Sequence, residues 1–162
     1  MTALVAATAE QTRALGARLA PLLRPGDLLL LSGDLGAGKT TFAQGLGAGL
    51  GVRGAVTSPT FVISRVHPSL VGGPALVHVD AYRLGALAEL DDLDLDTSLE
   101  DAVTVVEWGS GLAEPLAENR LEVEIVRAHG ADEAEDRTLR LTAVGARWTG
   151  IDLDGALSAA VP

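Results

Sequence analysis

The chain has 162 residues, of which 48% are hydrophobic and 21% charged, and this size and composition predict one folded domain over residues 1–162. Its formal net charge of −10 excludes a general nucleic-acid-binding surface, because no basic face is available to replace counterions along a phosphate backbone, so we expect no extensive direct contact with nucleic acid. The absence of cysteine excludes disulfides, thiolate metal sites and thiol catalysis, and it fits a reducing, cytoplasmic location.

The first part of the chain predicts a strand, a helix and a second strand. Leu4–Ala7 is a short possible strand, and leucines at helical spacing over Glu10–Leu23 predict a helix that ends before Pro25-Gly26. Asp27–Ser32, with the sequence DLLLLS, indicates a strand buried on both faces, as in a parallel sheet. No basic residue precedes the first apolar run, and no run is long enough to span a bilayer, so we expect neither a signal peptide nor a membrane segment.

After a glycine-rich stretch, the pattern continues with one helix and three strands. Lys39–Leu50 predicts the helix. Phe61–Val66 and Ala75–Val79 predict two strands joined by a Pro/Gly turn with the sequence HPSLVGGP. Ala102–Val106 is apolar almost throughout and predicts another buried strand.

The last third of the chain predicts a hairpin and a short helix. Leu121–Val126 and Thr138–Ala143 alternate apolar and polar residues, which is typical of a half-exposed antiparallel hairpin. Leu153–Ala160 predicts the C-terminal helix. The elements together indicate a single α/β domain with a mixed parallel and antiparallel sheet flanked by helices.

The glycine-rich stretch GDLGAGKTTF matches the phosphate-loop pattern G-x-x-x-x-G-K-[ST] at every fixed position, from Gly33 to Thr40. A buried strand before it and a helix after it provide the context that such a loop needs, so we expect a P-loop NTPase-like domain. Lys39 is the only lysine of the chain, and all other basic residues are arginine. A compact ammonium fits between two phosphates where a planar guanidinium does not.

We therefore expect the loop to bind ATP and Mg²⁺. Backbone N–H groups of the loop and the positive end of the helix dipole would hold the phosphates, and Thr40 would place its hydroxyl on Mg²⁺. Lys39 is the expected catalytic cation. The expected nucleotide-binding residues of the loop are consecutive: Gly33, Asp34, Leu35, Gly36, Ala37, Gly38, Lys39, Thr40 and Thr41.

The class of P-loop protein is narrowed by what the sequence lacks. With Lys39 already used, no N-K-x-D motif for guanine exists, which excludes GTPases of the Ras type. No ABC-type signature follows the loop. A small kinase that transfers the γ-phosphate of ATP to a small-molecule acceptor remains an alternative, although no arginine-rich segment is available to close over the acceptor.

Three later motifs, VTSPTF (Val56–Phe61), HVDAYRL (His78–Leu84) and VEWG (Val106–Gly109), follow the loop in order. With them the chain resembles the TsaE family, also called YjeE, from Glu10 to about Ala143. These are small P-loop ATPases of bacterial tRNA threonylcarbamoyladenosine biosynthesis. The resemblance implies ATP binding with Mg²⁺, slow hydrolysis to ADP, and a role in modifying the adenosine next to the anticodon. It also implies action on the partner pair TsaB and TsaD, whose complex it would reset between turnovers.

The resemblance implies roles for residues at the ends of two strands. Asp80 is expected to face Mg²⁺ and the γ-phosphate, the alternative being an aspartate that caps the next turn. Glu107 is expected to occupy a second Mg²⁺ position or to orient the attacking water, the alternative being a carboxylate in solvent at the sheet edge. Which of the two touches the metal stays open. Trp108 is expected near the nucleotide, although a strand-end tryptophan is more often part of the core.

Other segments carry two interpretations each. Thr57–Thr60 could sense the γ-phosphate as a switch or form a plain turn. Arg83 could stabilise transition-state charge or pair with the acidic stretch Glu89–Asp101, which is itself a solvated face or a docking surface. Arg137 lies in a region that can approach the nucleotide in this family. The three histidines lack metal-ligand spacing, and His78 is expected to be structural.

Overall fold

The computed structural model describes residues 2–33, 38–52, 64–80, 101–107, 119–127 and 137–158. Within these ranges the helices are α1 (Ala9–Leu19), α2 (Lys39–Leu50) and α5 (Leu153–Ser158), with 3-10 turns η1 (Ala20–Leu22) and η4 (Ala146–Trp148). The strands are β1 (Thr2–Ala6), β2 (Leu28–Ser32), β3 (Ser64–His67), β4 (Ala75–Asp80), β5 (Ala102–Glu107), β6 (Arg120–Arg127) and β7 (Arg137–Val144). Of the helices described, none has the length and apolar character needed to cross a membrane.

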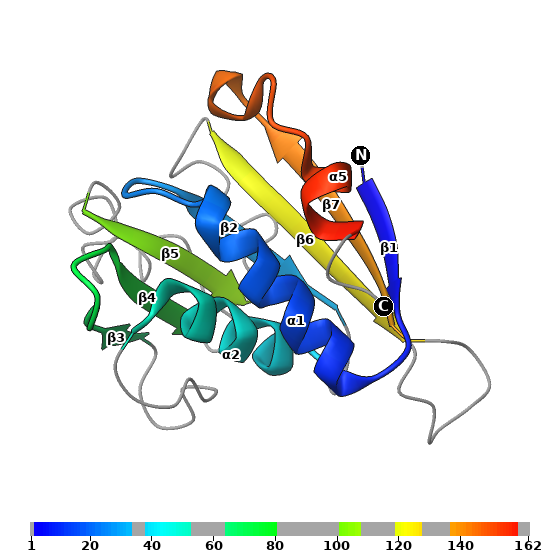
Figure 1. Ribbon diagram of the computed structural model, residues 1–162, viewed down its shortest axis with the longest axis horizontal. Coiled ribbons are helices and arrows are strands. Elements are labelled where there is room, and N and C mark those ends of the chain that lie inside the picture. Colours follow the sequence, from blue (N-terminus) through cyan, green and yellow to red (C-terminus); the bar gives the residue numbers. More distant parts are fainter. Residues whose placement is uncertain are drawn as a thin grey trace.

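All of these strands form one seven-stranded sheet in the order β1-β7-β6-β2-β5-β4-β3 (Figure 1). The four central strands are parallel: β2 pairs with β6 on one side and β5 on the other, and β5 pairs with β4. The outer pairs β1–β7, β7–β6 and β3–β4 are antiparallel. The predicted α/β fold with a mixed sheet is therefore confirmed. The carboxyl ends of the four parallel strands lie side by side at the same end of the sheet.

The helices α1, α2 and α5 lie over the same face of this sheet (Figure 1). The core between them combines helix side chains such as Leu15 and Phe42 with sheet side chains such as Leu31 and Val105. On β2, residues Leu28 to Leu31 are all buried and none is more than 3% exposed. A strand that lies between parallel neighbours and is buried at every position accepts apolar residues throughout, which explains the run of leucines.

Glycines bring α1 and α2 into backbone contact. A Cβ added to Gly45 of α2 would lie 1.8 Å from the carbonyl oxygen of Arg13, and a Cβ on Gly16 of α1 would lie 2.3 Å from that of Phe42. Both distances are far below any real Cβ contact, and the obstacle is backbone in each case. The two helices lie side by side in Figure 1, and the glycines allow this close approach.

Most expected elements are found with small shifts at their ends. α2 has the expected bounds, and β6 and β7 form the expected antiparallel hairpin. The helix expected to run to Leu23 is wrong at its end, since α1 stops at Leu19 and continues as the 3-10 turn η1. Pro21 lies in this turn and lacks the N–H that an α-helix would use there. The strand expected from Phe61 is described only from Ser64 onward, and residues 61–63 lie outside the described residues.

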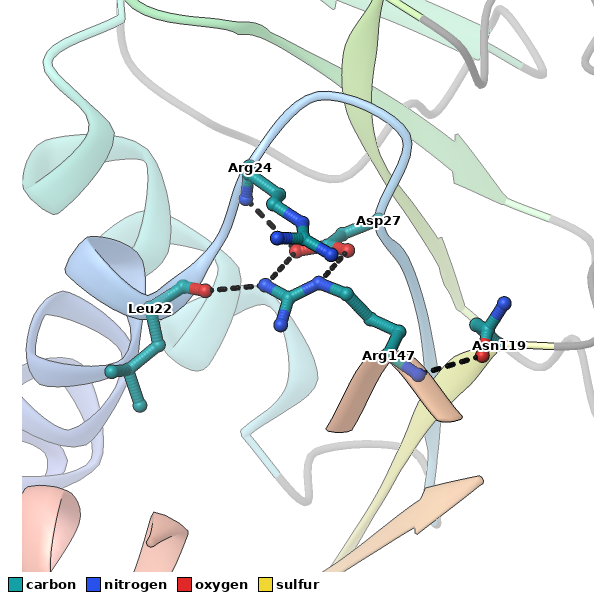
Figure 2. A network of polar contacts seen from close by, with 5 residues as sticks. All are labelled: Leu22, Arg24, Asp27, Asn119 and Arg147. Carbon is teal, nitrogen blue, oxygen red and sulfur yellow. Dashed lines mark hydrogen bonds and ion pairs between the residues drawn. The ribbon is translucent and has the colours of Figure 1, made fainter. Parts of the chain in front are cut away.

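A buried ion pair holds the amino end of β2 to the C-terminal part of the chain (Figure 2). Arg147 of η4 donates from Nε to Oδ1 of Asp27 over 2.9 Å and from a terminal nitrogen to Oδ2 over 3.0 Å. The same guanidinium donates to the carbonyl oxygen of Leu22 over 2.7 Å, and the Arg147 N–H donates to Oδ1 of Asn119 over 3.0 Å. The network joins η1 and η4 to the residues just before β2 and β6, at the end of the sheet opposite the glycine loop.

Candidate functional site

The helix α2 begins directly after the glycine loop and presents an uncapped amino end. Its N-cap residue, Gly38, has a φ of +110°, a backbone conformation that favours glycine. No side chain in the described part of the chain caps this end, and the first N–H groups of a helix have no acceptor within it. Such an end attracts anions, because the N–H groups and the positive pole of the helix dipole point outward together.

Lys39 is the first residue of α2 and is only 6% exposed. Its ammonium reaches back to the start of the motif and donates a hydrogen bond from Nζ to the carbonyl oxygen of Gly33 over 2.7 Å. Phosphate oxygens are stronger acceptors for an ammonium than a neutral carbonyl is. The contact is therefore one that a bound phosphate could replace.

Thr40 and Thr41 follow in the first turn of α2, and both are half-buried. A hydroxyl at the position of Thr40 is adjacent in sequence to the buried ammonium of Lys39, which suits an oxygen ligand for a hard cation such as Mg²⁺. The other loop positions expected to bind nucleotide, Asp34, Leu35, Gly36 and Ala37, lie outside the described residues. Their contribution stays a prediction.

Two carboxylate positions end neighbouring strands at the edge of the sheet where the glycine loop begins. In the strand register Glu107 lies opposite Leu31 of β2 on one side and Asp80 of β4 on the other. Because Leu31 stands two residues before Gly33, this row connects the start of the loop to both acidic positions. Glu107 is 4% exposed, while nothing is described of the Asp80 side chain beyond its place in the register. Which of the two would ligate Mg²⁺ stays open.

Glu107 lies within hydrogen-bonding distance of a buried histidine on the neighbouring strand. Its Oε2 lies 2.6 Å from Nε2 of His78 on β4, and the two residues are 4% and 0% exposed. Sequence reasoning assigned His78 only a structural role and gave no sign of this pair. A signal was present, however, because His78 precedes Asp80 by two residues, and residues two apart on a strand share a face.

A second basic side chain lies beside the amino end of α2. The position that a Cβ on Gly38 would take is 3.9 Å from Nε of Arg137, at the start of β7, and 3.8 Å from the methyl carbon of Thr12 on α1. Arg137 thus lies near the loop on the β6–β7 side of β2, whereas Glu107 lies on its β5 side. The order of the strands brings Arg137 close to the loop. Its expected approach to the nucleotide stays a prediction.

Several expected site residues cannot be placed. Trp108, the segment Thr57–Thr60 and Arg83 lie outside the described residues, as does the acidic stretch apart from Asp101, which is exposed. Among the residues that the structure does describe, no group of three or more His, Cys, Asp or Glu side chains could hold a metal ion by itself.

Comparison with known proteins gives one consistent family. The model of the family described as "Threonylcarbamoyl adenosine biosynthesis protein TsaE" matches residues 6–138. The tRNA threonylcarbamoyladenosine biosynthesis protein TsaE of Streptomyces coelicolor is 64% identical over 142 residues, which cover 87% of this chain and 96% of that protein. The protein of the same description from Bacillus subtilis is 43% identical over 140 residues, covering 86% of this chain and 84% of its own.

A solved structure agrees with these sequence relatives. The crystal structure of YdiB from Bacillus subtilis superposes with a TM-score of 0.73 at 35% sequence identity. The match covers 97% of this chain and 93% of that chain. The similarity therefore extends over the whole sheet and its helices and is not confined to the glycine loop.

Proposed function

The chain belongs to the TsaE family of threonylcarbamoyl adenosine biosynthesis proteins, and from this premise we propose that it serves the threonylcarbamoyladenosine modification of tRNA as an ATP-binding, slowly ATP-hydrolysing protein. The modified base is the adenosine next to the anticodon. ATP is the proposed substrate, Mg²⁺ the proposed cofactor, and the bond broken is the one between the β- and γ-phosphates of ATP.

One observation carries the proposal. The buried ammonium of Lys39 contacts Gly33 at the start of the glycine loop, and the uncapped amino end of α2 follows the same loop. Glu107 lies opposite Leu31 in the strand register, and Leu31 stands two residues before the loop. The first two features suit a polyphosphate, and the third places a carboxylate within the same region. Anion-binding groups beside a carboxylate at the carboxyl ends of parallel strands suit a nucleotide with its cation.

The residues would divide the work of hydrolysis between charge stabilisation and positioning. Transfer of the γ-phosphoryl group to water spreads negative charge over the phosphate oxygens, which the ammonium of Lys39 and the N–H groups at the start of α2 would stabilise. Glu107 would orient the attacking water and accept its proton. The oxygen of the water bonds to the γ-phosphorus, its proton passes to Glu107, and the bond to the β-phosphate oxygen breaks. The products are ADP and inorganic phosphate.

The metal site would draw on the same residues. Thr40 supplies a hydroxyl, and Glu107 or Asp80 supplies a carboxylate, which are oxygen ligands of the kind that Mg²⁺ prefers. When bound, Mg²⁺ neutralises phosphate charge. The residues present therefore fit this ion.

We further propose that the partners are proteins of the TsaB and TsaD type. The ATPase would not transfer the threonylcarbamoyl group itself, and its ATP cycle would reset the partner complex between turnovers. A net charge of −10 supports this division, because so acidic a chain is unsuited to extensive contact with the phosphate backbone of tRNA. Extensive binding of tRNA is then left to the partners.

The proposal is tested with ATP labelled at the γ-phosphate, incubated with the protein and Mg²⁺ in the presence and absence of the partner proteins. We expect ATP binding, release of the label as inorganic phosphate, and loss of hydrolysis when EDTA removes the metal. Label that passes to a small-molecule acceptor faster than to water would instead identify a kinase. A protein that binds no ATP would overturn the proposal.

A further inference from the structure

His78 is buried more completely than its chemistry favours. It lies in the middle of β4 at 0% exposure, and its Nδ1 has no hydrogen-bond partner among the residues that the structure describes. A buried polar atom without a partner is destabilising, and native proteins tolerate few of them. Leu76, two residues earlier on the same strand, shows that an apolar side chain fits this face. The retention of an imidazole at position 78 therefore needs a reason beyond packing.

A polar contact of the His78 ring points to that reason. Nε2 lies 2.6 Å from Oε2 of Glu107, a separation typical of a hydrogen bond strengthened by charge. Because an ionised carboxylate only accepts hydrogen bonds, Nε2 would be the ring nitrogen that donates to Glu107 in its ionised form. A carboxylate that is 4% exposed needs such a donor, because burial without one is strongly unfavourable.

We propose that His78 is the positioning residue of Glu107 in ATP hydrolysis. This inference rests on the proposed function. The imidazole, fixed inside the sheet, holds Oε2 and so sets the position and plane of the carboxylate. Oε1 makes no hydrogen bond to the part of the chain that the structure describes, and it is the oxygen left to hold the attacking water. His78 itself is too deeply buried to touch the nucleotide, so it acts only through Glu107.

The test compares two substitutions of similar length that differ in one donor. His78→Met fills the space but cannot donate to Glu107, whereas His78→Gln places an amide N–H near the position of Nε2. We expect the turnover number for ATP in His78→Met to fall about 10- to 100-fold, the usual cost of losing a partner that orients a functional group. ATP affinity should stay within about twofold, because His78 does not contact the nucleotide. His78→Gln should recover most of the lost turnover.

Two controls separate positioning from general damage. His67 on β3 is another buried histidine, at 4% exposure, and it lies opposite Leu76, away from Glu107. His67→Met should leave turnover unchanged. In the Glu107→Gln background, His78→Met should reduce turnover little further, since residues that act as a unit are not additive. If His78→Met does not fold, His78→Asn, whose shorter amide falls short of Glu107, takes its place.

The outcomes distinguish this inference from the proposed function. Loss of hydrolysis in Glu107→Gln with full hydrolysis in His78→Met would overturn the positioning role and leave the ATPase standing. Equal turnover in the methionine and glutamine variants would overturn it as well. Wild-type protein that hydrolyses no ATP, alone or with its partners, would overturn the proposed function first.

Discussion

The ammonium of Lys39 donates a hydrogen bond to the carbonyl oxygen of Gly33, the first residue of the same loop, over 2.7 Å. This contact explains why the chain keeps its single lysine at this position. The side chain is 6% exposed, and a planar guanidinium would need more room than this buried position provides.

Both Lys39→Ala and Lys39→Arg are therefore expected to weaken ATP binding. The alanine variant loses the charged donor, which corresponds to about 2 kcal/mol, or roughly a 30-fold rise in Kd. Titration of each variant with a fluorescent ATP analogue measures this change. Arg140→Ala, which removes an exposed basic residue of β7, is the control and should bind as the wild type does. Unchanged affinity in Lys39→Ala would refute the phosphate-loop assignment.

Arg137 is expected to contribute to nucleotide binding because it lies beside Gly38 at the amino end of α2. Replacement by alanine removes a cation near the proposed nucleotide site, and we expect ATP affinity to fall about tenfold, in line with the loss of one charged hydrogen bond. Isothermal titration calorimetry with ATP measures the Kd of Arg137→Ala and of Arg140→Ala, a control on the same strand. Equal affinity in the two variants would show that Arg137 serves another purpose.

The buried pair of Asp27 and Arg147 is expected to matter for stability. Removal of one member leaves the other charge buried without its partner, which costs about 3 kcal/mol. For a domain of this size, Arg147→Met should lower Tm by about 6 to 12 °C. The matched control is Arg140→Met, which breaks the exposed pair with Glu124 and should change stability by less than about 1 kcal/mol. Thermal unfolding followed by circular dichroism measures both, and similar Tm values would contradict this role.

The close contact of α1 with α2 predicts that Gly45→Ala is destabilising, even though alanine is the better helix former by about 1 kcal/mol. The added methyl group would overlap the carbonyl oxygen of Arg13, and overpacking of this kind costs about 1 to 3 kcal/mol. Gly73→Ala, at an exposed position between β3 and β4, is the control, since its methyl group would lie 3.7 Å from the hydroxyl oxygen of Ser69, an ordinary contact. Urea denaturation of both variants should show a lower midpoint for Gly45→Ala alone.

Much of the fold could be predicted from local patterns. The run of leucines in β2 and the alternation in β6 and β7 reflect how many faces of each strand are covered, and the glycine loop marks where α2 begins. Pro21 shows the limit of such patterns, because leucine spacing continued past it while the α-helix did not.

The long-range contacts of the fold and of the site could not be predicted in this way. Asp27 and Arg147 are 120 residues apart, and His78 meets Glu107 only because β4 and β5 are neighbours in a particular register. Arg137 reaches Gly38 through the order of β7, β6 and β2, which no periodicity encodes. Pairs of this kind depend on tertiary structure, so the sequence supplied the residue types and the sheet determined which of them meet.

The most direct test of the central claim is the reconstituted modification of tRNA. Partner proteins of the TsaB and TsaD type would be supplied with tRNA, a threonylcarbamoyl donor, ATP and Mg²⁺, and threonylcarbamoyladenosine counted per partner complex over time. With the wild-type chain we predict repeated turnover, and with Lys39→Ala, or without the chain, a stop after the first round. Equal yields in all three reactions would contradict the account.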